Sequence, residues 1–131
     1  MPVLARNKKA FHDYFIEDKL EAGIELVGTE VKSVKAGKVS IKESFIRIIR
    51  NEIFVMNMHI TPYEFGNINN VAESRVRKLL LNRREIKKWS EKIKEQGYTI
   101  VPISIYTKQR LVKMEIGLAK GKKMHDKRES L

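Results

Sequence analysis

The stretch GIELVGTEVKSVKAGK, residues 23–38, predicts a strand that turns into a short helix. Before Gly28 the apolar residues recur at every second position, and after it they recur at every third, which is the change of period from strand to helix. Thr29 is the candidate N-cap, and Glu30 lies where the helix dipole favours a negative charge. Gly37 can adopt the left-handed conformation that ends a helix.

Three lysines of this stretch leave two interpretations open. Lys32, Lys35 and Lys38 project from the short helix. These residues alone favour a capped surface helix with solvated lysines. The alternative is a helix that lies over one end of a barrel and contacts nucleic acid.

The composition predicts one basic globular domain. The chain has 131 residues, is 42% hydrophobic, and carries 27 Lys and Arg against 16 Asp and Glu, a formal net charge of +11. Such an excess favours a polyanionic partner, most often nucleic acid, with a membrane surface as the second possibility. No apolar run approaches the roughly 20 residues that span a bilayer. Cysteine is absent, which excludes disulfides and thiolate zinc sites and permits a cytosolic location.

Alternating apolar residues predict antiparallel strands along most of the chain. A long first strand from Tyr14 is predicted to bend or bulge near Asp18 or Gly23. The other predicted strands are 41–49, a third strand with Phe54, Met56, Met58 and Ile60 on one face, a short extended segment at 79–81, and the hairpin 99–106 with 112–118. Pro102 predicts an edge strand or weak pairing at its position.

One longer helix is predicted to begin after Asn82. Asn82 is a good N-cap, Glu85 completes a variant of the capping box, and Gly97 ends the helix. Ile86, Trp89 and Ile93 form a narrow apolar stripe. Trp89 is therefore predicted to anchor the core rather than to stack on a base.

The ends and the long loop are predicted to be irregular. Residues 1–10 are interpreted as a frayed terminus or as a basic arm that binds phosphate. Residues 61–74 are predicted to form a long loop, and residues 121–131 a basic, disordered tail. Residues 1–120 would then form the folded domain.

The predicted fold is mainly β, a small closed antiparallel β-barrel of OB type with about three flanking helices. An SH3-like barrel and an open α+β sheet are the alternatives.

Catalytic motifs are absent from the sequence. It has no phosphate-binding loop and no metalloprotease or serine-hydrolase motif. The three histidines are not at metal-ligand spacing, and His12 and Asp13 would point to opposite faces of a strand. The carboxylates of the first strand are Glu17, Asp18, Glu21 and Glu25. They could hold a metal in a small nuclease, but a solvated face of the strand is favoured. Binding without catalysis, cofactor or metal is the prediction.

Several separated motifs occur in the order found in one protein family. They are residues 7–10 with 12–17, 28–33 with 36–38, 78–82 with 84–85, 97–99, 117–123 and 125–128. In these motifs the chain resembles the SsrA-binding protein family, also called small protein B, the partner of transfer-messenger RNA (tmRNA) in bacterial ribosome rescue. The resemblance covers nearly the whole chain.

The resemblance implies a cytoplasmic, monomeric, non-catalytic protein with an OB-type barrel. It implies that the protein grips the tRNA-like domain of tmRNA and, with elongation factor Tu, delivers it alanyl-charged to the 30S decoding region of a stalled ribosome. The runner-up is a general structured-RNA-binding or ribosomal protein with the same barrel. The resemblance implies these RNA-binding residues: Asn7, Lys8, His12, Glu30, Leu80, Asn82, Lys120, Gly121 and Lys122. Lys32 and Lys38 of the opening stretch are added to them as candidates.

The resemblance also assigns a role to the tail. His125, Asp126, Lys127 and Arg128 are implied to begin a segment that contacts the decoding centre. Family members usually continue beyond this segment with a further basic tail, whereas this sequence stops at Leu131. RNA binding is expected not to need such an extension, and the ribosomal step is expected to need it.

Glu30 is the least expected member of a surface that binds RNA, because its charge is negative. It could accept a hydrogen bond from a base amino group or from a ribose 2′-OH. As a carboxylate at an exposed helix start, it is expected to be replaceable by Ala with little loss of stability.

Overall fold

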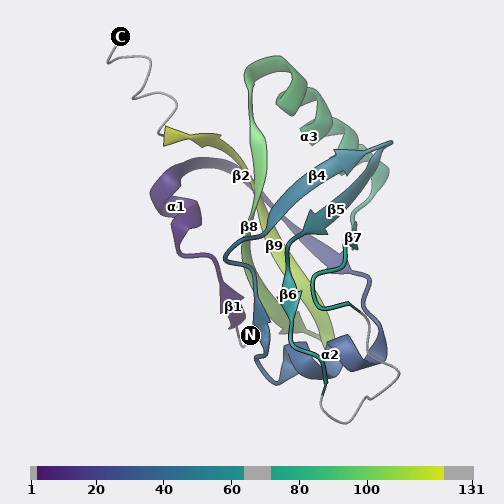
Figure 1. Ribbon diagram of the computed structural model, residues 1–131. Helices are drawn as coiled ribbons and strands as arrows, with labels where there is room; N and C mark the ends of the chain where they lie inside the picture. The colour runs from purple at the N-terminus through teal and green to yellow at the C-terminus, as the bar shows by residue number, and fades with distance from the viewer. Residues whose placement is uncertain (1–2, 64–71, 123–131) are drawn as a thin grey trace.

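The computed structural model describes residues 3–63 and 72–122, in which a curved antiparallel sheet carries three helices (Figure 1). The larger sheet has the strand order β1-β8-β9-β2-β7-β5-β4, and β3 pairs with β6 separately. The strands are β1 Val3–Arg6, β2 Tyr14–Ile24, β3 Val39–Ser40, β4 Phe45–Ile49, β5 Glu52–Met56, β6 His59–Ile60, β7 Arg77–Leu80, β8 Thr99–Lys108 and β9 Leu111–Gly121. The helices are α1 Lys9–Asp13, α2 Gly28–Lys35 and α3 Arg83–Gln96.

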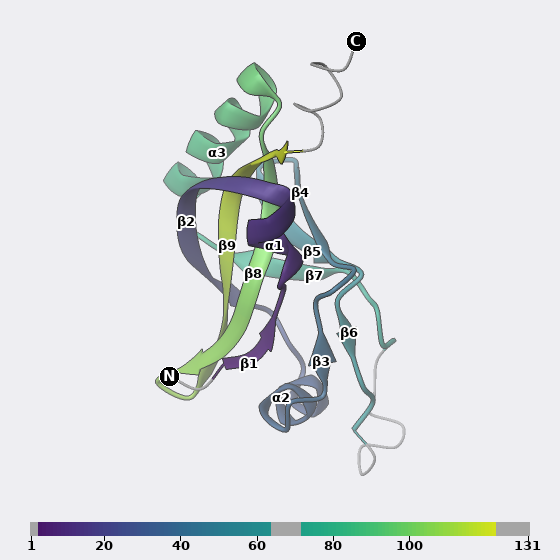
Figure 2. The ribbon, with the colours of Figure 1, turned by 90° about the vertical axis from the view of Figure 1, so that its left-hand side faces the viewer.

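The two longer helices lie at opposite ends of the molecule. In both ribbon views α3 is at one end of the long strands and α2 is at the other (Figures 1 and 2). The C-terminal end of β9 lies at the α3 end. Residues 123–131, with most of the predicted tail, lie outside the described residues, as does the middle of the predicted 61–74 loop.

The predicted closed barrel is wrong for the described part of the chain, where the sheet ends in two edges, β1 and β4. Strand β4 lies near β8, so the sheet curls back toward itself. The outer edge of β8 is already occupied, because β1 pairs with it from Val3 to Arg6. Beyond β1, the backbone N–H of Asn7 donates to Ile103 O (2.9 Å) and its side-chain amide donates to Pro102 O (3.0 Å). The N-terminal segment therefore takes the edge that a closing strand would need.

The N-terminal residues are neither frayed nor a free arm from Val3 onward. They form the edge strand β1 and the short helix α1. His12 and Asp13 were expected to point apart on a strand, but they end α1, and His12 Nδ1 lies 2.8 Å from Asp13 Oδ1. In a helix, adjacent side chains are about 100° apart around the axis rather than on opposite faces, so these two can meet.

The long strand β2 has the predicted bulge. Its register against β9 shifts between Ile16 and Asp18, so the β2 strand bends where its alternation is interrupted. Beyond the bulge the two strands stay paired to Gly23. This long ladder with β9 and the shorter one with β7 make β2 the centre of the sheet.

The β4–β5 hairpin has the predicted turn but not the predicted face. Arg50 and Asn51 both have positive φ (52° and 66°), as a tight hairpin turn requires. Ile53 and Val55 are buried, whereas Phe54 and Met56 are half-buried on the outer face. The backbone breaks its alternation at Asn57 (φ 56°), which returns Met58 and Ile60 to the core. Of the predicted 41–49 strand only residues 45–49 form a strand, β4, and residues 41–44 link it to the short strand β3 at 39–40.

The β8–β9 hairpin contributes 10 of the 23 buried hydrophobic residues in the described part of the chain. The predicted inward residues of β9 are all buried: Val112, Met114, Ile116 and Leu118. Strand β8 is not an edge strand, because β1 covers it, but its register shifts between Pro102 and Ser104. Pro102 itself is in register with Ile116, so the structure shows an irregular ladder directly after the proline in place of the expected edge.

Helix α3 matches its prediction. Asn82 Oδ1 accepts from the Glu85 N–H at 2.9 Å, and Gly97 is left-handed (φ 68°). Ile86 and Trp89 are buried in the core, and Trp89 Nε1 donates to Asp18 Oδ2 at 3.1 Å. The indole therefore anchors α3 on β2 as predicted.

Candidate nucleic-acid interface

Helix α2 begins two residues earlier than its sequence predicts, because Val27 rather than Thr29 precedes it. Val27 is the N-cap residue, with extended backbone, and Thr29 lies within the first turn. The Glu30 carboxylate accepts from the Val27 N–H at 3.1 Å, so an acid at the third helical position satisfies this donor. Gly37 has φ 79°, which confirms the predicted left-handed end.

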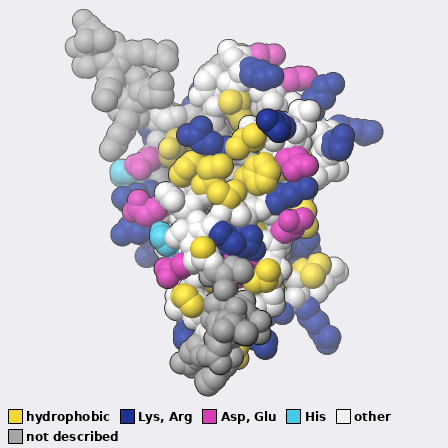
Figure 3. Space-filling model, turned by 45° about the vertical axis from the view of Figure 1, so that its right-hand side comes forward, with side chains coloured by type: hydrophobic (Ala, Val, Ile, Leu, Met, Phe, Trp, Pro, Cys, Tyr) yellow, Lys and Arg dark blue, Asp and Glu magenta, His cyan; other side chains and the backbone are white. Residues whose placement is uncertain are grey.

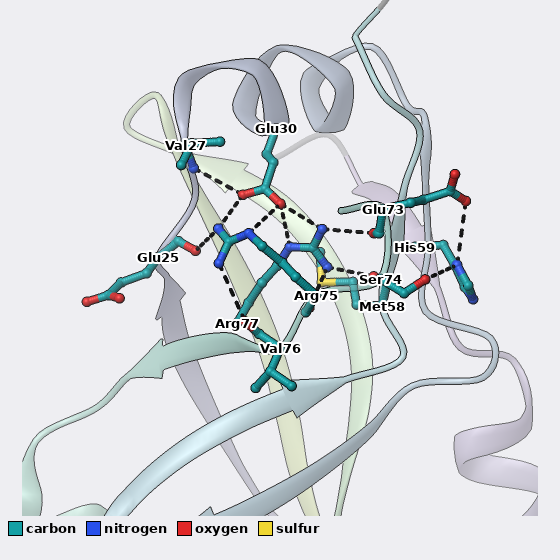
Figure 4. Close-up of polar contacts among 10 residues, drawn as sticks. All are labelled: Glu25, Val27, Glu30, Met58, His59, Glu73, Ser74, Arg75, Val76 and Arg77. Atoms are coloured by element: carbon teal, nitrogen blue, oxygen red, sulfur yellow. Dashed lines mark hydrogen bonds and ion pairs between the residues drawn. The ribbon is translucent and has the colours of Figure 1, made fainter. Parts of the chain in front are cut away.

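Glu30 is held by two arginines (Figure 4). Arg75 donates from Nε to Oε2 (3.1 Å) and from Nη2 to Oε1 (2.5 Å). Arg77 donates from Nε to Oε2 at 2.8 Å, and its Nη2 lies 2.6 Å from the same oxygen. Arg77 also donates to the carbonyl oxygens of Met58 (2.6 Å) and Glu73 (2.9 Å). The cluster therefore ties α2 to the chain before β6 and to the chain that enters β7.

The cluster is buried, which overturns the expected exposure of Glu30. The Glu30 residue is 4% exposed and Arg77 is fully buried. Burial opposes ionisation of Glu30, but hydrogen bonds from Arg75, the Val27 N–H and Arg77 outweigh it and lower the pKa of the carboxyl. Removal of one member of a buried ion pair typically costs about 3–5 kcal/mol. Glu30→Ala is thus expected to damage the fold, contrary to the sequence-based expectation.

One positive charge of the cluster is left over, since one carboxylate faces two guanidinium groups. Arg77 is enclosed, whereas the Arg75 side chain is 30% exposed. The surplus charge therefore reaches the surface at Arg75, beside the first turn of α2. A phosphate group could be bound there, because a partly buried guanidinium attracts an anion more strongly than a solvated one does.

Arg75 and Arg77 were missed as site residues by the sequence analysis. A signal was present, because residues 75 and 77 are alternate positions leading into a strand and so share a side. Nothing in the sequence indicated that this side would face α2, because 45 residues separate Arg75 from Glu30. The pairing depends on the tertiary fold.

Leu80 and Asn82 lie where β7 leads into α3. Leu80 is 48% exposed on the outer face of β7, opposite Gly23 of β2. A Cβ atom at Gly23 would lie 3.2 Å from Leu80 Cβ, so the glycine leaves room for the leucine. Asn82 is exposed and caps α3.

A second group of predicted residues lies around α1 and the C-terminal end of β9, away from α2 (Figure 2). The β2–β9 ladder pairs Tyr14 with Gly121, which places the end of β9 beside α1. Lys122 Nζ donates to the Phe11 carbonyl oxygen at 3.2 Å. Predicted site residues on these segments are Asn7, Lys8, His12, Lys120, Gly121 and Lys122.

Two lysines of this second group contact aromatic rings, the half-buried Tyr98 and the exposed Phe15. Lys120 Nζ lies 4.7 Å from the centre of the Tyr98 ring, and Lys122 Nζ lies 4.8 Å from that of Phe15. The structure therefore does not gather the predicted residues on one surface. Lys32, Lys38 and Glu30 lie on or beside α2, and the second group lies toward the α3 end (Figure 2).

The acidic residues of β2 are engaged with other side chains. Asp18 accepts from Trp89, and Glu21 accepts from the Tyr106 hydroxyl (2.5 Å) with Lys108 at 3.5 Å. The Tyr106 hydrogen bond lowers the pKa of Glu21, and burial together with Glu21 raises the pKa of Tyr106. Within residues 3–63 and 72–122, no three His, Asp or Glu side chains are grouped to hold a metal ion. No helix in these ranges is long and apolar enough to cross a membrane.

The fold and the charge define a small, basic, mainly antiparallel β protein, a class in which nucleic-acid binding is common. Residues 4–131 match the family model described as SmpB protein. The chain belongs to this SmpB family.

Curated relatives and a solved structure agree with the family assignment. The SsrA-binding protein of Fusobacterium nucleatum is 64% identical over 98% of this chain and 87% of its own length. That of Caldanaerobacter subterraneus is 58% identical over 98% of this chain and 82% of its own. A chain of the structure described as "tmRNA-SmpB: a journey to the center of the bacterial ribosome" has a TM-score of 0.74 at 46% identity, covering 93% of this chain and 85% of that one.

Proposed function

We propose that this protein binds the tRNA-like domain of tmRNA and delivers it to stalled ribosomes. The observation that carries the proposal is family membership over residues 4–131, with SsrA-binding proteins among close relatives. In this proposal the protein is a cytoplasmic, monomeric, non-catalytic RNA carrier. It acts with alanyl-charged tmRNA and elongation factor Tu at the 30S decoding region.

Two cationic regions at different ends of the fold support a carrier that contacts RNA in more than one place. One is the α2 end, with Lys32, Lys38 and Arg75, and the other is the junction of α1 with the end of β9. Each can bind phosphate through Lys or Arg side chains. Leu80 and Asn82 add an apolar and an amide contact near the start of α3.

Glu30 acts indirectly in this proposal. The carboxylate is too buried for a base to reach it without breaking the arginine pairs. Instead it fixes the Arg75 guanidinium, whose exposed part binds an RNA phosphate. Loss of Glu30 would then weaken RNA binding by releasing Arg75.

The finer fold and domain assignments are also proposals. We interpret the curled, open sheet as an OB-type arrangement in which β1 takes the edge of β8. The folded domain, expected at residues 1–120, would then extend to Gly121 at the end of β9. The tail that follows would supply His125, Asp126, Lys127 and Arg128 to the decoding centre. These four residues lie outside the described part of the chain.

The test is to purify the tagged protein from a bacterial host that makes tmRNA and to sequence the RNA that copurifies. Strong enrichment of tmRNA over total tRNA and ribosomal RNA is expected. Uniform recovery of structured RNAs would favour the general RNA-binding alternative. Cleavage of the RNA that stops on addition of a chelator would favour the nuclease.

The tail is tested separately in a peptide-tagging assay on stalled ribosomes. Deletion of residues 125–131 is expected to leave thermal stability within about 0.5 kcal/mol and to reduce RNA affinity modestly. Tagging is expected to fall much further, because the cationic tail is proposed to order against ribosomal RNA. Because the ribosomal step is expected to need a further basic tail, the comparison is also made in a tail-extended form of the chain. Equal tagging by that form with and without residues 125–131 would refute the role of the tail.

A further inference from the structure

The outer face of β4, β5 and β7 carries an exposed apolar patch. Hydrophobic side chains gather over the β4–β5 hairpin and are bordered by Lys and Arg side chains (Figure 3). In this part of the described chain the exposed large hydrophobic residues are Phe45, Ile49, Val76 and Leu80. Phe54 and Met56 add half-buried apolar surface on the same face. Contiguous apolar surface of this kind marks interaction sites more often than isolated exposed residues do.

The strand registers order this face into three rows. Phe45 is opposite Met56 in the first row. In the central row Phe54 is paired with Arg47 of β4 on one side and with Lys78 of β7 on the other. The third row pairs Ile49 with Glu52. An aromatic ring therefore lies between two cations at the centre of the face.

Side-chain contacts strengthen this arrangement. The Arg47 guanidinium carbon lies 5.3 Å from the centre of the Phe45 ring, and Lys78 Nζ lies 3.4 Å from a Glu52 carboxylate oxygen. The patch thus combines π-surfaces with positive charge. Glu52, the one acid in the three rows, is already paired.

We propose that this face is a platform on which unpaired RNA bases stack, with Phe45 and Phe54 as the stacking rings and Arg47 and Lys78 as the phosphate contacts. Single-stranded bases stack on exposed aromatic rings and on arginine planes, while nearby cations bind the backbone. An apolar protein partner would fit less well, because it would have to desolvate the two cations in the central row. The inference rests on the proposed function, since it takes RNA as the ligand, but it assigns residues of the β4–β5 hairpin.

The platform is tested with an unstructured 12-nucleotide RNA that carries 2-aminopurine, and with the same RNA annealed to its complement. The single strand is expected to bind with quenching of its fluorescence, because the base stacks. The double variant Phe45→Leu with Phe54→Leu is expected to lose at least about fivefold in single-strand affinity, and the quenching with it. Duplex binding, which depends on phosphate contacts, is expected to change less than twofold.

Two further variants keep the test decisive. Phe45→Trp keeps an aromatic ring and is expected to retain affinity and quenching. Leu111→Ala removes an apolar side chain that is more exposed than Phe45 and lies beside the β8–β9 turn, and it is expected to have no effect. A double Leu variant that stays folded by thermal melting and binds the single strand as the wild type does would overturn the platform and favour a protein partner. The proposed function is tested separately. It would be overturned if the wild type showed no preference for the tRNA-like domain over other RNAs.

Discussion

Glu30 links helix α2 to the arginines before and within β7. Its carboxylate caps the helix through the Val27 N–H and also neutralises two guanidinium groups. Sequence reasoning located the capping position but placed it at the surface, because local patterns do not reveal that Arg75 and Arg77 approach from 45 and 47 residues away. The family motif implies that Glu30 contacts RNA, but its contacts in the structure show that it stabilises the fold.

Replacement of Glu30 by Gln should destabilise the protein in a pH-dependent manner. The folded-state pKa of Glu30 is lowered from 4.5, so its stabilising effect is full above that pH and is lost as pH falls through the folded value. The wild type should exceed Glu30→Gln by several kcal/mol at pH 7, on the order of the 3–5 kcal/mol for a broken buried pair, and by less at pH 3.

The measurement is denaturant unfolding of both proteins from pH 7 to pH 3. Glu43→Gln, at an exposed carboxylate, is the control and should change stability by less than about 0.5 kcal/mol. A stability difference that is small at pH 7 and does not shrink in acid would show that Glu30 is not the centre of a buried ion pair.

Helix α3 and the end of α2 were the parts best predicted from sequence, because their start and stop signals are local, whereas α1 was not predicted. Asn82, Gly97 and Gly37 act where the patterns indicated. Strand faces were predicted less well, since one residue of positive φ at Asn57 reverses which side chains are buried. Such a reversal leaves only a weak trace in a pattern of alternating hydrophobic residues.

Two glycines that flank α2 should respond oppositely to Ala. Gly37 has φ 79°, where an L side chain is strained, so Gly37→Ala should cost about 1 kcal/mol. Gly28 begins the helix outside the left-handed region, and a Cβ atom added there would meet nothing within 4 Å, so Gly28→Ala should stabilise by about 0.4–1 kcal/mol. Thermal unfolding of both variants checks this. Equal effects would mean that backbone conformation does not distinguish the two sites.

Asn82 should reveal separate roles in folding and binding. Asn82→Ala removes the cap on Glu85 N–H and should cost about 1 kcal/mol, whereas Asn82→Ser can still cap and should cost much less. Both variants lose the side-chain amide, so both should bind RNA about five- to tenfold more weakly. Melting curves and RNA titrations on the same samples test this. Full RNA affinity of the Ser variant would leave Asn82 with a capping role alone.

At the scale of the whole molecule, the sequence predicted an antiparallel β protein with a basic surface but not its open sheet. Closure was inferred from the number of strands, whereas the outcome depends on the edge of β8, which β1 and Asn7 occupy. The candidate RNA-binding residues likewise came from motifs along the chain, and folding separates them into the α2 end, the β7–α3 connection and the α1–β9 junction. Which motifs share a surface depends on strand order, and the order of motifs in sequence does not determine it.

The most direct test of the central claim is a competition between the tRNA-like domain of tmRNA and an elongator tRNA of similar length. Both RNAs carry similar phosphate charge, so the net charge of +11 attracts both, and it attracts both less as salt rises. The proposed function predicts that fluorescence anisotropy at physiological salt gives at least tenfold tighter binding of the tRNA-like domain. It also predicts that this preference persists when salt is doubled while both affinities fall. Equal affinities at both salt concentrations would contradict the claim and leave a general electrostatic RNA binder.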